Sequence, residues 1–440
     1  MASVIRSVQE LTEKAAALGL SFPVRQDLSV LAEKVSIGGK TAKNRLVCQA
    51  MEGCDGTARG IPNELTIRRY RRLAAGNAGI VWFEATAVLP EARANPRQLF
   101  ITKANLDAFK RIADDIRETA VKATGEAPLI VMQLTHSGRY SKPEGTPAPL
   151  IAYHNPLFET EKTLPESCVV TDAYLDKVNE ALVNGALLAE QAGFDGADIK
   201  CCHRYLNSEL LSAYFRPGKY GGSFENRTRL LRESAAGAAQ VCGGDFIVAT
   251  RLNVYDGFPY PYGFGVSPSG GTDFDKTEPA KLLSTLAAAG MPLANISMGN
   301  PYVNPHVNRP FAFGPYEAPE DPLAGVYRML EGTAALKAAA GEMKLIAGAF
   351  SFLGPAAPQT AAGYIGGGCF DFAGFGRTIF AYPDFADDIL HRGGMQKEKC
   401  CICCSKCSEI MRAGGTPGCV IRDRETYLPI YNAYCGRKTG

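Results

Sequence analysis

Six of the chain's 14 cysteines lie in one short stretch near the C-terminus, namely Cys400, Cys401, Cys403, Cys404, Cys407 and Cys419. A disulfide framework would spread cysteine pairs through a short secreted chain, whereas clustering at one end of a large chain indicates a metal site. Four thiolates can hold either a zinc ion or an iron–sulfur cluster. Metal binding by this stretch is therefore the first chemistry to consider.

Two sets of four ligands can be drawn from this stretch. The first has the spacing C-x2-C-x3-C-x11-C and consists of Cys400, Cys403, Cys407 and Cys419. The second has the spacing C-x2-C-x2-C-x11-C and consists of Cys401, Cys404, Cys407 and Cys419. A structural zinc site usually pairs two C-x2-C knuckles, whereas three closely spaced cysteines and a distant fourth are more typical of a [4Fe–4S] cluster. Spacing alone favours the cluster, keeps zinc as the alternative and leaves the register open.

The composition is that of an ordinary globular protein, with 46% hydrophobic and 21% charged residues among 440. These values exclude a disordered, collagen-like or coiled-coil chain. The 47 Lys and Arg residues nearly balance the 45 Asp and Glu residues and form no basic run, so we expect no nucleic acid and no membrane as partners. No apolar run is long enough to span a membrane, and the charged N-terminus is unlike a signal peptide, so we expect a cytoplasmic location.

The elements that must position these groups begin with an N-terminal helix and a hairpin, both expected within residues 1–44. Apolar residues between Val4 and Leu18 form a helical stripe that ends before Gly19. Residues Leu28–Asn44 alternate loosely around the Gly38-Gly39 turn, which is typical of a hairpin.

Residues 45–392 repeat a short apolar run followed by a loop and a segment of helical periodicity. The eight runs are Leu46–Met51, Ile80–Phe83, Leu129–Leu134, Ala197–Ile199, Phe246–Leu252, Leu293–Met298, Leu345–Ala347 and Phe370–Ala373. Eight strands alternating with helices predict an α/β fold, the closed (β/α)8 TIM barrel, with its chemistry at the C-terminal ends of the strands. A doubly wound sheet is the alternative, but no Gly-x-Gly-x-x-Gly follows the first strand. We expect residues 393–440 to form a separate cysteine-rich extension that binds the cluster.

Two long loops interrupt this alternation of strands and helices. They are Tyr140–Val169 after the third strand and Asn253–Thr277 after the fifth. Loops of this length are usually lids or substrate walls, and plain surface insertions are the alternative.

Several short sequence motifs occur in the same order as in the Old Yellow Enzyme family, and the resemblance extends from about Leu28 to Val420. They are Lys43-Asn44-Arg45, Glu84–Val88, Gln133–Arg139, Ala192–Gly196, Tyr220–Arg227, Gly376-Arg377 and Pro383-Asp384-Phe385. With the cysteine tail, they make the chain resemble the iron–sulfur branch of this NADH:flavin oxidoreductase family, especially the N-terminal barrel of its 2,4-dienoyl-CoA and 2-enoate reductases. The resemblance implies FMN, and a [4Fe–4S] cluster in the first register, which leaves Cys401 and Cys404 without a role.

The resemblance also implies the residues that bind FMN: Ala50, Met51, Glu52, Ala85, Gln133, Arg251, Gly348, Gly374, Gly376 and Arg377. The glycines and Arg377 follow strands seven and eight, where barrels bind phosphate groups. Arg251 is expected near the N1–C2 carbonyl region of the flavin and Gln133 at its pyrimidine edge. The family usually has Pro-Met/Leu-Thr/Cys where this chain has Ala50-Met51-Glu52, unless the register slips by one and brings Gly53 beneath the flavin.

Old Yellow Enzymes reduce an electron-poor C=C bond with hydride from the flavin, while two donors hold the carbonyl oxygen and a tyrosine protonates the α-carbon. Tyr205 matches the tyrosine and His203 the second donor, whereas Lys200 replaces the first donor. Lys200 would suit a carboxylate or a developing enolate, or it could pair with an acid such as Glu52. His306 is a second candidate acid, because a similar His-x-x-Arg follows strand six in the family.

The implied partners are a small unsaturated substrate and an electron donor. Because only Val420–Gly440 follow the last cysteine of the stretch, we expect NAD(P)H to reach the flavin directly, or a ferredoxin or flavoprotein subunit to dock near Cys400–Cys419. The oligomeric state, including a homo-oligomer, is left open. Two other functions remain as alternatives, an amine dehydrogenase of the trimethylamine dehydrogenase type and a non-catalytic electron-transfer subunit. The amine dehydrogenase is disfavoured, because such enzymes hold the substrate cation on aromatic faces, tryptophan best, and the one tryptophan, Trp82, lies on a strand.

Overall fold

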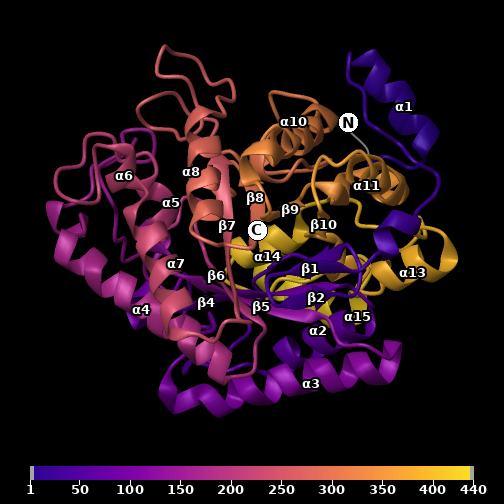
Figure 1. Ribbon diagram of the computed structural model, residues 1–440, viewed down its shortest axis with the longest axis horizontal. Coiled ribbons are helices and arrows are strands. Elements are labelled where there is room, and N and C mark those ends of the chain that lie inside the picture. Colours follow the sequence, from indigo (N-terminus) through magenta and orange to yellow (C-terminus); the bar gives the residue numbers. More distant parts are fainter. Residues whose placement is uncertain (1–3, 437–440) are drawn as a thin grey trace.

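The computed structural model describes residues 4–436 and contains a closed barrel of eight parallel strands (Figure 1). The strands are β3 (Leu46–Cys48), β4 (Ile80–Ala87), β5 (Leu129–Thr135), β6 (Gly196–Ile199), β7 (Ile247–Tyr255), β8 (Leu293–Met298), β9 (Lys344–Ala347) and β10 (Phe372–Phe375). They follow chain order around the barrel, and β10 closes it by pairing with β3, Gly374 opposite Val47. The predicted (β/α)8 barrel is confirmed, and the doubly wound sheet is excluded.

Two strands extend beyond the apolar runs that predicted them. β4 continues past Phe83 through an irregularity in its pairing with β5, and β7 continues past Leu252 through one in its pairing with β8. The added residues include Glu84 and Asn253, which are polar, buried and hydrogen-bonded. Hydrophobicity alone misses such strand ends, because they carry polar groups to the mouth of the barrel.

Helices lie between successive strands and surround the barrel (Figure 1). The longer ones are α2 (Glu64–Ala75), α3 (Leu106–Thr124), α4 (Asp172–Gln191), α7 (Arg229–Val241), α8 (Thr277–Ala288), α10 (Pro322–Ala334), α11 (Ala357–Gly366) and α13 (Phe385–Arg392). Short helices in the connections are α5 (Leu206–Leu210), α6 (Phe224–Arg227) and α9 (Pro305–Asn308). The short helix α12 (Thr378–Ala381), like α13, follows the last strand, β10. The predicted N-terminal helix is α1 (Val8–Ala17), capped by the Ser7 side chain, which accepts a hydrogen bond from the Glu10 N–H.

The predicted hairpin is present as β1 (Val35–Ile37) and β2 (Lys40–Ala42), and it closes the N-terminal end of the barrel. Its buried residues Val35, Ile37 and Ala42 form one apolar cluster with residues that begin barrel strands. Those strand residues include Ile80, Leu129, Ile247 and Leu293. With this end filled, the opposite end is left for a site, as is general for such barrels.

The segment after the barrel forms α14 (Lys406–Arg412) and α15 (Arg424–Cys435), which pack together and against the barrel. Asp423 pairs with Arg68 on α2 at 2.7 Å, and Arg97, in the connection after β4, donates to the Gly414 carbonyl oxygen at 2.6 Å. These contacts fix the cysteine stretch relative to the barrel.

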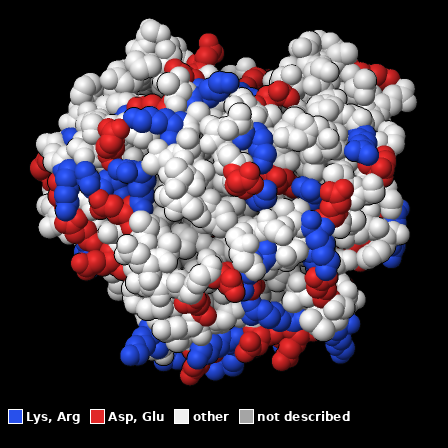
Figure 2. Space-filling model, in the orientation of Figure 1, with Lys and Arg blue, Asp and Glu red and all other residues white. Residues whose placement is uncertain are grey.

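Within residues 4–436, no helix combines the length and apolar character needed to cross a bilayer. The face shown in Figure 2 carries basic and acidic residues intermixed, as expected from their near balance in the sequence.

Candidate active site

A pocket at the C-terminal ends of the barrel strands, which we call the main pocket, collects the residues expected to bind FMN. Its lining includes Ala50, Met51, Glu52, Ala85, Gln133, Arg251, Gly348, Gly374, Gly376 and Arg377, together with Lys200, His203 and Tyr205. These residues come from strand ends and loops that are far apart in the chain, and closure of the barrel brings them together.

One part of the main pocket offers open space over glycines beside a buried cation. A Cβ atom on Gly348 would have no neighbour closer than 3.9 Å, and one on Gly376 none closer than 3.6 Å. Arg377 is buried and donates Nη2 to the Pro310 carbonyl oxygen at 2.5 Å, while its Nη1 has no partner among the described residues. Accessible backbone and an unpartnered guanidinium nitrogen are a donor set that fits a phosphate group.

The buried carboxylate of Asp198 orients the polar groups of another wall. It accepts hydrogen bonds from Gln133 Nε2 at 2.7 Å, from Trp82 Nε1 at 2.8 Å and from the backbone N–H of Arg251 at 2.6 Å. Because Asp198 takes the amide nitrogen of Gln133, the amide oxygen remains as an acceptor for a ligand. Arg251 Nε has no partner among the described residues. An acceptor and a cation fit the polar edge of a flavin ring.

Glu52 lies in the main pocket, so the first strand does not slip by one residue to place Gly53 there. Its Oε1 accepts a hydrogen bond from Asn95 Nδ2 at 2.9 Å. Gly53 turns away and donates its N–H to Glu84 Oε2 at 2.8 Å. Burial raises the pKa of the Glu52 carboxyl, and the charge of Lys200 opposes that effect.

Lys200, His203 and Tyr205 follow β6 and converge on the main pocket. Lys200 Nζ lies 3.9 Å from the centroid of the Tyr205 ring, and within the described residues it forms no ion pair with Glu52. Burial lowers the pKa of Lys200, and it also lowers the pKa of His203 far below its usual range, helped there by Arg251 and Lys200. His203 is therefore neutral, and its buried Nε2 has no partner in residues 4–436.

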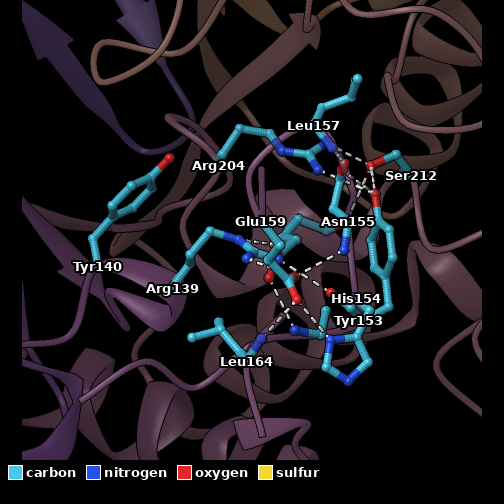
Figure 3. Close-up of polar contacts among 12 residues, drawn as sticks. Arg139, Tyr140, Tyr153, His154, Asn155, Leu157, Glu159, Leu164, Arg204 and Ser212 are labelled. Carbon is cyan, nitrogen blue, oxygen red and sulfur yellow. Dashed lines mark hydrogen bonds and ion pairs between the residues drawn. The ribbon is translucent and has the colours of Figure 1, made fainter. Parts of the chain in front are cut away.

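The turn that presents His203 is held by a buried arginine. His203 and Arg204 both adopt left-handed backbone conformations, with φ of 64° and 57°. Such conformations cost free energy in residues other than glycine and persist where the surroundings fix them. Arg204 supplies that anchor, because its guanidinium donates to Asp256 Oδ2 at 2.8 Å. It also donates to Ser212 Oγ at 2.5 Å and to the Tyr153 hydroxyl at 3.1 Å (Figure 3).

Polar contacts around Arg139 hold the long loop after β5 against the barrel (Figure 3). Arg139 donates to Glu159 Oε1 at 3.0 Å and to Glu209 Oε1 at 2.7 Å. Burial alone would raise the pKa of Glu159, but hydrogen bonds from the Asn155 N–H, from His154 and from neighbouring groups lower it to about 2. These contacts anchor the loop, although none of its residues lines the main pocket.

Tyr302 is a pocket residue that sequence reasoning missed. Its hydroxyl lies 2.8 Å from the hydroxyl of Tyr205, and its ring stacks on Tyr140 with centroids 3.9 Å apart. Asn300 fixes this arrangement by donating Nδ2 to the Tyr140 hydroxyl and accepting the Tyr302 N–H, both at 2.8 Å. The signal in the sequence is a tyrosine that directly follows Gly299-Asn300-Pro301 at the end of β8.

His306 does not reach the main pocket. Its Nδ1 lies 2.6 Å from the hydroxyl of Tyr316, and the residue is not part of the pocket lining. The expectation that His306 assists Tyr205 therefore finds no support in its position, and Tyr302 is the residue that contacts Tyr205 instead.

The cysteine stretch lines a narrow second pocket, which we call the thiol pocket. Its cysteines are Cys401, Cys403, Cys404, Cys407 and Cys419. Cys400 lies outside it and donates to the Gln396 carbonyl oxygen at 3.3 Å. Within residues 4–436, no group of three or more His, Cys, Asp or Glu side chains has the arrangement of a metal site. As a donor set, the thiols of this pocket match the chemistry of an iron–sulfur cluster.

The main pocket and the thiol pocket adjoin. Cys407, Arg377 and Phe380 belong to the linings of both. A group held by the thiols would therefore lie beside a group held in the main pocket.

Comparisons with known proteins agree with this architecture. An NADPH dehydrogenase from Halalkalibacterium halodurans is 34% identical over 227 residues, which make up 50% of this chain and 62% of that protein. This chain thus matches less than two thirds of the relative's length. The structure of 2-naphthoyl-CoA reductase in complex with 2-naphthoyl-CoA has a TM-score of 0.73 at 20% identity, covering 93% of this chain and 58% of that one.

The old yellow enzyme homologue from Zymomonas mobilis has a TM-score of 0.61 at 20% identity, covering 84% of this chain and 94% of that one. At such low identities, these structures show a shared fold. Residues 31–264, more than half of the chain, match the NADH:flavin oxidoreductase / NADH oxidase family. On that match, the chain belongs to the NADH:flavin oxidoreductase / NADH oxidase family.

Proposed function

We propose that this protein is an FMN- and [4Fe–4S]-dependent oxidoreductase that reduces an activated C=C bond in an α,β-unsaturated carbonyl compound, carboxylate or thioester. The observation that carries the proposal is the composition of the main pocket, which brings Lys200, His203 and Tyr205 together with every residue expected to bind FMN. Family membership supports the flavin, and the thiol pocket supports the cluster.

FMN would be held by the residues with unpartnered polar atoms. Arg377 and the accessible backbone at Gly348 and Gly376 would bind its phosphate. Gln133 and Arg251 would bind the polar edge of its ring. Bound FMN would supply the hydride that reaches the β-carbon of the substrate.

The remaining steps belong to the chain's own side chains. Lys200 and His203 would donate hydrogen bonds to the carbonyl oxygen of the substrate, where negative charge develops in the transition state. Tyr205 would give its hydroxyl proton to the α-carbon and recover a proton through Tyr302, whose hydroxyl it contacts at 2.8 Å. Burial raises the pKa of both tyrosines, so each hydroxyl holds its proton until the substrate takes it.

The cluster would be held by the second set of cysteines. The thiol pocket includes Cys401 and excludes Cys400, which supports Cys401, Cys404, Cys407 and Cys419 rather than the register implied by the resemblance. Because Cys407 lines both pockets, a cluster there would lie beside the flavin and could exchange single electrons with it. An external electron donor, NAD(P)H or an electron-transfer protein, is part of the proposal.

Lys200 argues against an amine dehydrogenase. A cationic substrate would need a free aromatic face, and Lys200 Nζ already lies over the Tyr205 ring at 3.9 Å. A protonated Lys200 would also repel a second positive charge in the same pocket.

The test is anaerobic purification followed by two measurements. We expect about one FMN and about four iron atoms with acid-labile sulfide per chain. After reduction with dithionite, we expect the flavin absorbance to return when crotonate, crotonyl-CoA or 2-cyclohexenone is added. Protein without flavin, or a reduced flavin that none of these compounds reoxidises, would overturn the proposal.

A further inference from the structure

A side chamber of about 690 Å³ adjoins the main pocket. Glu52, Tyr302 and Met411 line both spaces, so the chamber communicates with the place where the proposed chemistry occurs. Its volume lies within the range of small-molecule binding sites. No step in the proposed reaction uses it.

The chamber is lined by three cations from separate parts of the chain. Arg97 follows β4, Lys142 begins the long loop after β5, and Arg412 ends α14. Arg97 donates to Gly414 O and Thr416 Oγ1, and Arg412 donates to Pro301 O, so these guanidinium groups are held in place by neutral acceptors.

None of these three cations has a carboxylate partner among residues 4–436, and the one acid in the chamber lining is Glu52, at the boundary with the main pocket. Elsewhere on this protein, basic side chains commonly pair with acids, as Lys34 does with Glu126 and Lys219 with Asp176. Three positive charges outnumber the one carboxylate of the described lining, Glu52, and Asp55 acts on Arg97 electrostatically without forming an ion pair with it. The net positive charge attracts an anion, and guanidinium groups match the geometry of phosphate oxygens.

We infer that the side chamber binds the phosphate-bearing part of a ligand whose reacting end lies in the main pocket. The reacting-end assignment rests on the proposed function, whereas phosphate binding by the chamber does not. Two ligands have this chemistry: a nicotinamide dinucleotide that delivers electrons, and a substrate carried as a coenzyme A thioester. The first would place its pyrophosphate in the chamber, and the second the phosphates of its carrier.

The direct test is calorimetric titration of the holoenzyme with inorganic pyrophosphate. We compare wild type, the double variant Lys142→Met/Arg412→Met and the control Lys110→Met, which removes an exposed lysine from α3. Loss of two charge-assisted contacts should raise the dissociation constant at least tenfold, and the control should bind like wild type. The difference should shrink at high salt. Equal binding by all three proteins would overturn the inference.

Anaerobic half-reactions distinguish the two ligands. If the chamber takes the nicotinamide dinucleotide, the double variant will need a higher NADPH concentration for flavin reduction, while reoxidation by crotonyl-CoA relative to 2-cyclohexenone will not change. If it takes the thioester, the KM for crotonyl-CoA relative to that for 2-cyclohexenone will rise at least tenfold. Loss of pyrophosphate binding with no change in either reaction would overturn the assignment of the ligand. Failure of the proposed function would appear separately, as missing FMN or absent reoxidation, with the pyrophosphate result intact.

Discussion

The hydroxyl oxygens of Tyr205 and Tyr302 lie 2.8 Å apart, so one of the two groups donates a hydrogen bond to the other. Tyr205 follows β6 and Tyr302 follows β8, and the stacking of Tyr302 on Tyr140 holds the pair in register. Tyr302 also borders the side chamber, whereas Tyr205 lines only the main pocket of these two spaces. The pair therefore forms a path along which a proton given up by Tyr205 can be replaced.

Substitution of either tyrosine should slow turnover, at different steps and to different extents. Tyr205→Phe removes the proton that we assign to the α-carbon, and general acids contribute a factor of about 10² to 10⁴. Tyr302→Phe leaves that proton and removes the group that replaces it, so we expect a smaller loss, about tenfold. Flavin reoxidation by 2-cyclohexenone in single-turnover stopped flow measures the loss in Tyr205→Phe, and steady-state kcat measures the loss in Tyr302→Phe. Tyr434→Phe, a change elsewhere in the side chamber, is the control.

Unchanged reoxidation in Tyr205→Phe would remove this residue from the mechanism. A wild-type rate in Tyr302→Phe, alongside a slow Tyr205→Phe, would reduce Tyr302 to a packing partner.

The two cysteine registers make opposite predictions. Because Cys401 lines the thiol pocket and Cys400 does not, we expect Cys401→Ser to lose most of its iron and Cys400→Ser to keep about four iron atoms per chain. Iron and acid-labile sulfide are measured after anaerobic purification, and Cys242→Ser, at the end of α7, is the control. Iron lost in Cys400→Ser and kept in Cys401→Ser would restore the first register.

The barrel could be predicted from sequence because each strand is an apolar run that hydrophobicity detects directly, and the Gly38-Gly39 hairpin carries its own turn signal. The cysteine register could not be predicted from sequence, because neighbouring cysteines are chemically identical. Only the backbone conformation decides which of their side chains point into the thiol pocket. Cys403 and Ser405 adopt left-handed conformations, with φ of 51° and 60°, and spacing does not encode such turns.

The same limit applies to the acid that accompanies Tyr205. Tyr302 and His306 are four residues apart in the connection after β8, and both are chemically able to carry a proton. Asn300 fixes the turn that brings Tyr302 inward, and His306 is left against Tyr316. Tertiary contacts, rather than residue type, decide which one enters the site.

The Arg204–Asp256 pair should be a large stabilising element. Both side chains are almost fully buried, and the 2.8 Å contact neutralises two charges that would otherwise lie unpaired in the interior. Arg204→Met should lower the free energy of unfolding by about 3–5 kcal/mol, because it leaves Asp256 buried and uncompensated. Arg204→Met/Asp256→Asn removes both charges and should recover part of that loss. Urea denaturation measures the difference, and equal stability of the two variants would contradict this account.

His136 should make stability depend on pH. Burial lowers its pKa from 6.5 to about 4, while its Nδ1 accepts the Gly138 N–H and its Nε2 lies 2.8 Å from the Tyr174 hydroxyl. Between these two pKa values the unfolded chain binds a proton that the folded protein does not. Stability therefore falls as the pH decreases from 6.5 toward 4, by about 3 kcal/mol in full.

The measurement is the unfolding free energy between pH 7.5 and 5. In His136→Gln the part of the slope due to this residue should disappear. Parallel pH profiles for wild type and His136→Gln would show that His136 is not the source.

Lys200 is the residue in which this chain departs most clearly from the enzymes that it resembles, and its position indicates what the substrate carries. It is buried at the end of β6, with Nζ against the Tyr205 ring and no carboxylate partner among residues 4–436. An ammonium group on a flexible stem suits a carboxylate or a developing enolate better than a neutral ketone that must be held rigidly. We expect Lys200→Met to cost at least about 3 kcal/mol in transition-state stabilisation, the scale of losing a preorganised oxyanion donor.

The substrate dependence of this effect identifies its cause. Comparison of kcat/KM for crotonate and 2-cyclohexenone should show the larger loss for crotonate in Lys200→Met, and Lys200→His should shift the preference toward 2-cyclohexenone. Because burial lowers the pKa of Lys200, the advantage for crotonate should decline as rising pH removes the proton, and it should do so at a lower pH than for an exposed lysine. If Lys200→Met keeps kcat/KM for both substrates and only lowers the melting temperature, Lys200 supports the fold and the preference for an anionic substrate is wrong.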